Sequence, residues 1–261
     1  MNLDTNALQQ RLNTLGYPVV IDGDYGPKTR AAVIRFQRDH NLVEDGIAGE
    51  KTLAALYNKD TSHLLSQADI VNAAALLNVD IATIYAVKAV ESRGNGFLSD
   101  GRPVILYERH VMRRRLKANG MSGYQITDFM QRYPNLVSTQ TGGYQGGTTE
   151  HYRLDLAMTL HLSSALESCS WGLFQIMGYH WDRLGYANIN DFVRAMEQSE
   201  GNQLAAFVQF ILTDNRLHTA LKAQDWAAFA KGYNGPGYKK NRYDSKLAEA
   251  YADHLERESV A

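Results

Sequence analysis

Apolar residues recur at helical spacing through most of the chain, and short polar or glycine-rich segments separate the apolar runs. The first run, A-L-Q-Q-R-L-N-T-L-G-Y, predicts a helix that stops at Gly16, because glycine readily takes the left-handed conformation that ends a helix. The run I-A-T-I-Y-A-V-K-A-V-E-S is apolar on nearly every face, which predicts a buried helix that Asp80 caps and that closes at Gly94. The other helices predicted by the pattern cover residues 66–78, 109–119, 123–133, 153–167, 191–212 and 225–230, with a last one from about Asp244.

Three segments depart from the helical pattern. In G-F-L-S-D-G-R-P-V-I-L-Y-E an Asp-Gly turn separates two short apolar runs, which predicts a small β-hairpin. The stretch T-G-G-Y-Q-G-G-T-T is a glycine loop without the G-K-[ST] ending of a phosphate cradle, and we interpret it as a mobile segment. The stretch S-C-S-W-G-L-F-Q-I-M-G, read alone, is compatible with the start of a helix.

An internal repeat organises the first part of the chain. D-G-D-Y-G-P-K-T-R-A-A-V (22–33) is echoed by D-G-I-A-G-E-K-T-L-A-A-L (45–56), with Thr29 and Thr52 each expected to begin a helix after a turn. The sequence therefore predicts a three-helix module over residues 1–58, a linker over 59–66 and a larger, mainly α domain with a β-hairpin over 67–261. A module this small has a marginal core, so we expect it to bind rather than to catalyse.

Composition and charge exclude several classes of partner. The 261 residues carry 27 Lys and Arg against 28 Asp and Glu, so no overall field favours nucleic acid or an anionic membrane. The single cysteine, Cys169, excludes an internal disulfide and is more typical of buried packing than of a nucleophile. The sequence shows no ordinary export signal and no run of eighteen apolar residues, so we expect no membrane insertion.

Glu91 is the strongest candidate for a catalytic residue. It lies at the C-terminal end of the predicted buried helix, four residues after Val87, where desolvation would raise the pKa of a carboxyl toward that of a general acid. Lys88 and Arg93 would act in the opposite direction. In the alternative interpretation, Glu91 is a helix-end glutamate paired with Lys88.

Glu108 follows the second run of the predicted hairpin. If the hairpin folds over the end of the Glu91 helix, the two carboxyls could face one cleft, and a separation of about 6.5 to 9.5 Å would leave room for the activated water of an inverting glycosidase. The alternative is a salt bridge from Glu108 to Arg109 or Arg113. Glu150, expected in a loop, and Glu167, expected in an ordinary helix, are weaker candidates.

Metal and cofactor chemistry find no support in the sequence. The histidines lack a metal-ligand spacing, His151 and His161 are not on one helix face, and neither H-E-x-x-H nor paired cysteines occur. No G-x-S-x-G motif is present either. We therefore predict no metal and no cofactor. The fifteen tyrosines and three tryptophans suit stacking on sugars.

The segment from Leu8 to Leu56, centred on D-G-D-Y-G-P-K-T-R-A-A-V-I-R-F-Q, resembles the peptidoglycan-binding module found at the ends of many cell-wall hydrolases. The resemblance implies binding to peptidoglycan, although several motif positions serve folding rather than contact, and a helix-turn repeat without a ligand is the alternative. The motif positions, which we take as candidate wall-binding residues, are Asp24, Tyr25, Gly26, Thr29, Phe36 and Gln37.

The larger domain resembles the N-acetylmuramidase domain of modular bacteriophage endolysins, a branch of the lysozyme-like superfamily that also holds goose-type lysozymes and lytic transglycosylases. Three motifs carry the resemblance in order: A-V-E-S-R-G around Glu91, S-W-G-L-F-Q-I-M-G from Ser170 and Y-N-G-P-G-Y from Tyr233. It implies a lysozyme-like fold in which Glu91 protonates the glycosidic oxygen between N-acetylmuramic acid and N-acetylglucosamine. The residues expected to line the saccharide cleft are Tyr107, Ser170, Trp171, Gly172, Gln175, Tyr233 and Asn234.

The resemblance leaves the second carboxylate open, because members of the superfamily differ in whether one exists; Glu108 is our choice on physical grounds. We expect an endolysin that hydrolyses peptidoglycan with inversion, acts as a monomer, and accumulates in the host cytoplasm until its release to the periplasmic wall. The alternatives are a lytic transglycosylase, which gives 1,6-anhydro products, and a non-catalytic wall-binding protein. The missing zinc pattern disfavours a peptidase.

Overall fold

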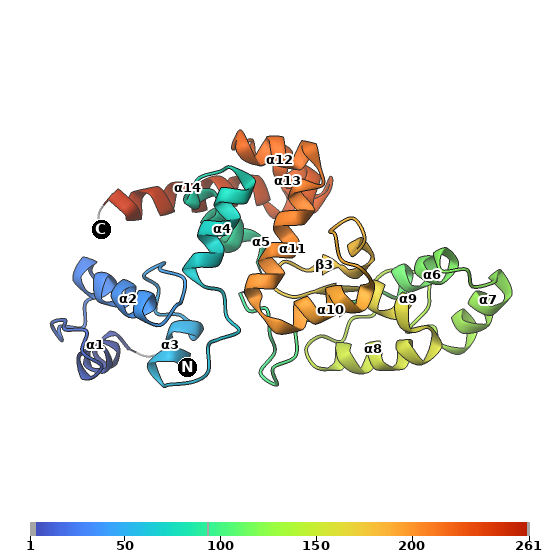
Figure 1. The fold of residues 1–261 in the computed structure, drawn as a ribbon, viewed down its shortest axis with the longest axis horizontal. Coiled ribbons are helices and arrows are strands. Elements are labelled where there is room, and N and C mark those ends of the chain that lie inside the picture. The colour runs from blue at the N-terminus through green and yellow to red at the C-terminus, as the bar shows by residue number, and fades with distance from the viewer. Residues whose placement is uncertain (1–3, 93, 260–261) are drawn as a thin grey trace. The chain divides into compact units, whose positions relative to one another are not determined.

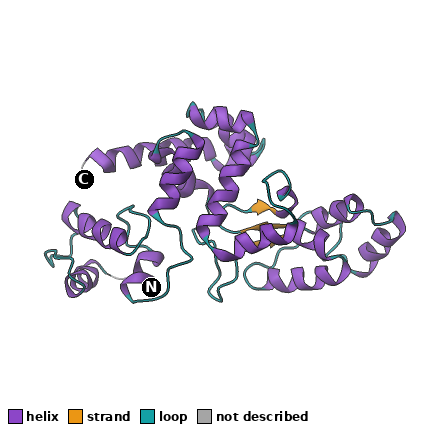
Figure 2. Cartoon of the chain, in the orientation of Figure 1, coloured by secondary structure: helices purple, strands orange, loops and turns teal. Residues whose placement is uncertain are grey.

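The computed structural model describes residues 4–92 and 94–259, and it confirms a mainly α fold with a small antiparallel sheet (Figures 1 and 2). Two compact units make up the chain. The first comprises the residues up to Val90 together with the segment from Arg216 onwards, and the second runs from Glu91 to Asn215. This division follows contacts within the chain, and the boundaries expected at residues 58 and 67 stay a prediction.

The first unit begins with the three predicted helices of the module, α1 (Thr5–Thr14), α2 (Pro27–Asp39) and α3 (Glu50–Leu56). Their core consists of buried residues that include Leu12, Phe36 and Leu56. α2 and α3 begin two residues before Thr29 and Thr52, since proline is well suited to the first position of a helix and Glu50 favours its positive end. The two threonine hydroxyls instead donate backward, to the carbonyls of Asp24 and Ile47, and tie each helix to the turn before it.

The rest of the first unit contains α4 (Gln67–Leu77), most of α5 (Ile81–Glu91), α12 (Asn215–Lys222), α13 (Trp226–Asn234), the short 3₁₀ helix η2 (Tyr238–Asn241) and α14 (Tyr243–Ser259). A capping box between Ser66 and Asp69 starts α4, and Asp80 accepts from the Thr83 amide at the start of α5, as expected. The sequence pattern missed α12, whose eight residues bury only one narrow apolar stripe.

The second unit contains α6 (Arg109–Ala118), α7 (Gly123–Arg132), α8 (Thr149–Leu160), α9 (Leu162–Glu167), η1 (Gly178–His180), α10 (Ile189–Gln198) and α11 (Glu200–Leu212). The helices expected over 153–167 and 191–212 are each split in two. The breaks fall at His161 and Ser199, which both have extended backbone and whose side chains accept from the amides of Ser164 and Asn202. Each break is therefore the N-cap of a new helix.

A three-stranded antiparallel sheet in the order β1-β2-β3 lies in the second unit, with β1 (Ile105–Tyr107), β2 (Cys169–Trp171) and β3 (Ile176–Met177). The Asp-Gly turn forms as predicted, with one bridge between Phe97 and Pro103. β1, however, pairs with β2 from far along the chain. The stretch 168–178 is thus a β-turn-β segment, and the reading of it as a helix start is wrong.

No single helix in the described part of the chain is long and apolar enough to span a membrane. By length and composition only, the pair α4 and α5, bent by 110°, passes the same test.

Candidate active site

Glu91 is the last residue of α5 and is half-buried; the helix is buried from Ala82 to Val87, whereas Ala89 is exposed and Lys88 and Val90 are half-buried. The side chain of Lys88 donates to the carboxylate of Asp45 at 3.1 Å, so its ion pair is with the module rather than with Glu91. Arg93, the other cation expected to act on Glu91, lies outside the described residues. The carboxyl of Glu91 therefore stands at the end of an apolar helix that is buried as far as Val87, and its last turn is more exposed than the sequence predicted.

Glu108 joins β1 to α6 and is held at both its backbone and its side chain. Its amide donates to the carbonyl of Ser168 at 2.9 Å. Its carboxylate, whose side chain is 15% exposed, accepts a hydrogen bond from the Tyr144 hydroxyl at 2.7 Å and lies 3.1 Å from Nδ1 of His110. Arg109, a partner considered from the sequence, donates instead to the carbonyls of Gln140 and Thr141.

Tyr144, which donates to the candidate residue Glu108, is a further candidate that the sequence did not single out. It lies in the glycine loop, where Gly142, Gly143, Gly146 and Gly147 all have positive φ. Partial burial, followed by the hydrogen bond to the carboxylate of Glu108, raises the pKa of Tyr144 to about 12, so the phenol remains a donor. In the sequence, a tyrosine with a pair of glycines on each side could have indicated a loop residue whose side chain contacts the site.

The loop that carries Tyr144 is fixed at its far end by Glu150, which accepts from the amides of Gln145 and Gly146 at 2.6 and 3.1 Å. Glu150 also binds Arg153 at 2.7 Å and is fully buried. Burial raises the pKa of Glu150, but the backbone amides and then Arg153 outweigh it, and the net pKa is below the ordinary value. Glu150 is thus a structural residue of α8, and the expectation that it lies in a loop is wrong.

Two expected sugar contacts, Tyr107 and Trp171, are buried in the interior. Tyr107 is fully buried and its hydroxyl donates to the carbonyl of Leu136, while the indole of Trp171 donates to the carbonyl of Leu166. Neither side chain has surface left for a saccharide. We therefore correct their assignment to packing, because aromatic side chains on a small buried sheet supply its core.

Gly172 and Gln175 shape the turn between β2 and β3. Gly172 has φ of +69°, and an added Cβ would lie 2.6 Å from Cγ of Gln203, so this glycine accommodates a protein side chain. The amide of Gln175 donates to the carbonyl of Gly172, and its oxygen accepts from the hydroxyl of Ser170, each at 2.9 Å. The turn is therefore pre-formed by its own side chains.

α11 contributes two buried polar residues that the sequence analysis did not single out. Gln203 accepts from the amide of Leu173 at 2.6 Å and donates to the carbonyl of Met196 at 2.8 Å. Glu200 accepts from the amide of Gly96 at 2.8 Å. Together they fix the β2–β3 turn and the segment that follows Glu91. In the sequence they could have been recognised as polar residues on the buried face of an apolar helix.

Glu167 is likewise structural. Its buried carboxylate accepts from Arg115, Asn119 and Trp181 at 2.8, 2.8 and 2.9 Å. Burial raises its pKa, and these hydrogen bonds more than reverse the effect, so the net pKa lies below the ordinary value of 4.5. A carboxyl held ionised in this way does not suit a general acid.

Tyr233 and Asn234 are the last residues of α13 and are both half-buried, with Tyr233 stacked on Phe229. They belong to the first compact unit, whereas Glu91 and Gln175 belong to the second. Their meeting in one cleft therefore stays a prediction.

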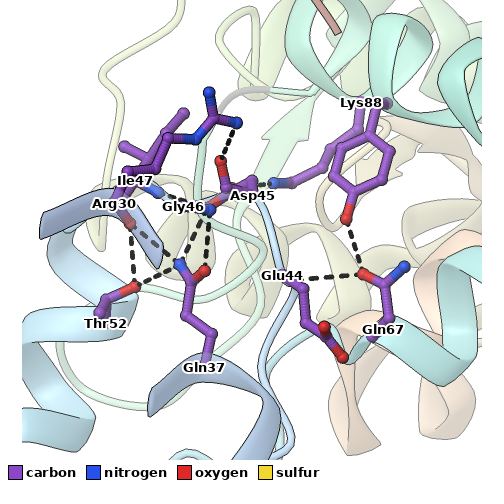
Figure 3. Close-up of polar contacts among 10 residues, drawn as sticks. Arg30, Gln37, Glu44, Asp45, Gly46, Ile47, Thr52, Gln67 and Lys88 are labelled. Atoms are coloured by element: carbon purple, nitrogen blue, oxygen red, sulfur yellow. Dashed lines mark hydrogen bonds and ion pairs between the residues drawn. The ribbon is translucent and has the colours of Figure 1, made fainter. Parts of the chain in front are cut away.

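The wall-binding candidates of the module fall into two groups. Thr29, Phe36 and Gln37 are buried, and the Gln37 amide holds the turn at Asp45 to Ile47 (Figure 3), so these residues serve folding. Asp24 and Tyr25 are exposed, and Gly26 is half-buried. A hollow of about 410 Å³ adjoins this second group; it is lined by Tyr25, Gly26, Pro27, Lys28, Arg30, Ala31, Ile34 and Arg257.

Cys169 is fully buried, and burial followed by nearby carboxylates raises the pKa of its thiol well above the ordinary value. It is not a poised nucleophile. Within the described part of the chain, His, Cys, Asp and Glu side chains form no group of three or more that could hold a metal ion.

Comparisons with known proteins agree with this organisation. The N-acetylmuramidase family model matches residues 80–255, and the model of a peptidoglycan binding domain matches residues 2–56. The crystal structure of Burkholderia AP3 phage endolysin is 46% identical, with a TM-score of 0.89 over 98% of this chain and 96% of that chain.

Two curated relatives match a short segment of this chain, each at 44% identity. An N-acetylmuramoyl-L-alanine amidase, CwlM, of Mycobacterium tuberculosis aligns over 55 residues, and a zinc D-Ala-D-Ala carboxypeptidase of Streptomyces albus G aligns over 54 residues. The alignments span 14% and 21% of the length of these relatives.

Proposed function

The chain belongs to the N-acetylmuramidase family and is a glycoside hydrolase of the lysozyme type, and from this premise we propose that it cleaves the β-1,4 bond between N-acetylmuramic acid and N-acetylglucosamine. Its substrate is the peptidoglycan of the bacterial wall, and its biological role is lysis of a phage-infected host. The full-length similarity to a phage endolysin supports this role.

Glu91 is proposed as the general acid. The observation that carries the assignment is its half-buried place at the end of an apolar helix whose residues 82–87 are buried, because a partly desolvated carboxyl can hold the proton that the leaving glycosidic oxygen requires. The backbone that follows Glu91 is anchored by Glu200 and Gln203, which limits the movement of the acid. Preorganisation of this kind lowers the cost of reaching the reactive geometry.

Glu108 is proposed as the general base. In this mechanism its carboxylate accepts a proton from a water molecule, whose oxygen attacks the anomeric carbon while Glu91 protonates the departing oxygen, and the configuration inverts. The hydrogen bond from Tyr144 supports the role, because a carboxylate that already accepts one donor is held in a defined direction.

A digest of purified sacculi analysed by mass spectrometry tests the reaction. We expect reducing-end sugars, and we expect Glu91→Gln to abolish their release. Products with a 1,6-anhydro end would show that the 6-hydroxyl of the sugar attacks, and the hydrolytic mechanism would then be replaced by transglycosylation. Full activity of Glu108→Gln would remove Glu108 from the mechanism and leave Glu91 as the single catalytic carboxyl.

The module is proposed to hold the enzyme on the wall through the exposed residues Asp24 and Tyr25 and the neighbouring hollow. Tethering raises the local substrate concentration without any new contact in the active site. We further propose that the protein acts as a monomer, remains in the host cytoplasm until release, and then reaches the periplasmic wall. Sedimentation of the Glu91→Gln variant with sacculi tests wall binding separately from catalysis.

A further inference from the structure

The internal repeat builds two turns with the same hydrogen-bond plan, the first turn (residues 22–25) and the second turn (residues 45–48). One buried glutamine organises each turn, Gln9 for the first and Gln37 for the second. In the first turn the amide of Gln9 donates to Asp22 Oδ1, Asp24 O and Thr29 Oγ1 at 2.7, 3.0 and 2.9 Å. In the second turn the amide of Gln37 donates to Asp45 Oδ1, Ile47 O and Thr52 Oγ1 at 2.9, 3.1 and 3.0 Å.

The two turns share this hydrogen-bond plan but differ in side chains, since Asp24 and Tyr25 stand where the second turn has Ile47 and Ala48, and they also differ in their surroundings. The second turn is docked on α4 and α5 (Figure 3). The remaining oxygen of Asp45, Oδ2, accepts from Lys88 of α5 at 3.1 Å, and the two side chains are only 20% and 21% exposed. The amide of Glu44, just before the turn, donates to Oε1 of Gln67 in α4 at 3.1 Å. The same oxygen accepts from the Tyr85 hydroxyl at 2.6 Å.

Polar contacts rather than close packing hold this docked surface. A hollow of about 250 Å³ lies beside it, lined by Asp45, Ile47, Tyr85, Lys88, Ala89, Ala250, Asp253, His254 and Arg257. The hollow leaves part of this surface without close packing, and the partly buried ion pair contributes more to its stability than an exposed pair would.

The first turn is more exposed, although the Tyr25 hydroxyl at its end donates to the carbonyl of Gly46 at 3.0 Å and accepts from the amide of Ala48 at 3.1 Å, both in the second turn. Asp22, Gly23 and Asp24 are all exposed, and Asp22 forms no ion pair with any described residue. The hollow of about 410 Å³ begins at Tyr25, the last residue of this turn, and continues along α2 past Lys28 to Ile34. Its lining combines apolar residues such as Ala31 and Ile34 with cationic side chains that include Lys28, a combination suited to the methyl groups and carboxylates of peptide stems.

We propose that the two copies of the repeat have divided their functions. The second turn is an intramolecular docking surface that fixes the module to α4 and α5 through Asp45–Lys88 and Glu44–Gln67. The first turn, exposed from Asp22 to Asp24, faces outward, and together with the hollow beside it, which Arg257 of α14 also lines, it takes the acidic peptide stem of the wall. The outward-facing half of the proposal rests on the proposed wall binding, whereas the docking half does not.

Hydrogen exchange of single backbone amides in the full-length protein tests the docking half. The Glu44 amide is protected by Gln67, outside the module, whereas the Gly46 amide is protected by Gln37, inside it. In Lys88→Met we expect the exchange rate of the Glu44 amide to increase about fivefold while that of the Gly46 amide is unchanged. The reason is that loss of one partly buried ion pair makes the second turn separate more often from α4 and α5. Asp45→Asn should act alike, since Asn can still accept from Gln37.

The repeat offers a matched control in Asp22→Asn, which makes the same change in the first turn. It should leave exchange at Glu44 as in the wild type. Unchanged exchange at Glu44 in Lys88→Met, or an equal effect of Asp22→Asn, would overturn the docking surface. Faster exchange at both Glu44 and Gly46 in Lys88→Met and Asp45→Asn alike would show that the module itself loosens, and would overturn it as well.

Sedimentation with sacculi tests the outward-facing half. Ala31→Trp fills the hollow from an exposed helix position, and we expect it to weaken binding at least fivefold, with Ala31→Ser as the control of similar size. Lys88→Met should bind within twofold of wild type. Wild-type binding by Ala31→Trp, or loss of binding in Lys88→Met, would overturn the division. If the wild-type protein itself fails to sediment, the proposed wall binding fails and the docking result still stands.

Discussion

Gly172 offers the sharpest test of how the β2–β3 turn is built. Gly172→Ala has two costs. The first is the left-handed backbone, with φ of +69°, which costs a non-glycine residue about 1 kcal/mol. The second is steric, because the new Cβ would meet Gln203, with Cγ and Oε1 each 2.6 Å away. Gln203 must move, and it then gives up hydrogen bonds to Leu173 and Met196 that are each worth about 1 kcal/mol.

The expected loss of unfolding free energy is therefore roughly 3 kcal/mol for Gly172→Ala. Gly185→Ala isolates the backbone part. Gly185 has φ of +86° in the same unit, and an added Cβ there would meet nothing within 4 Å, so we expect a loss of only about 1 kcal/mol.

Urea unfolding followed by tryptophan fluorescence measures both variants, since Trp171 and Trp181 report on the second unit. A difference of about 2 kcal/mol between the variants would match the hydrogen bonds that Gln203 gives up. If both variants lost the same stability, Gln203 would not constrain Gly172, and the structural account of the turn would be refuted.

Three further results are expected. Because the pKa of Glu167 is lowered in the folded state, its stabilising contribution is complete above the ordinary value of 4.5 and disappears as the pH falls below it. The melting temperature of Glu167→Gln should therefore depend less on pH between about 5 and 3 than that of the wild type. An equal dependence of melting temperature on pH in both proteins would contradict this. Tyr144→Phe should reduce kcat severalfold with little change in melting temperature, because it removes only the donor to Glu108 from an exposed side chain. The activity is measured as release of reducing ends. Activity equal to that of the wild type would show that Tyr144 has no role in the site. The Cys169 thiol should resist a water-soluble disulfide reagent in the native protein and react fully in denaturant, whereas rapid native reaction would contradict its burial and raised pKa.

Local signals were sufficient for much of the architecture. The repeat, the capping residues Ser66 and Asp80, and the apolar run before Glu91 each depend on neighbours in sequence, so the three-helix module, α4 and α5 could be predicted without coordinates. The split helices at His161 and Ser199 were missed because an N-cap inside a long apolar pattern does not change its periodicity.

The candidate site was predictable only in part. Glu91 could be singled out because its own helix sets its surroundings. Tyr144, Glu200 and Gln203 could not, because their roles arise from partners between 30 and 104 residues away in sequence. Tyr107 and Trp171 were taken for sugar contacts because an aromatic residue beside a motif looks the same whether it faces a cleft or a core.

The sequence by itself determined most of the helices, the repeat and the position of Glu91 at the end of an apolar helix, since hydrophobic periodicity, turn residues and caps act over a few residues. The tertiary structure alone decided the pairing of β1 with β2, the burial of Glu150 and Glu167 in ion pairs, and the different surroundings of two equivalent turns. Those features depend on which distant groups share a low-dielectric interior, and no local pattern encodes that choice.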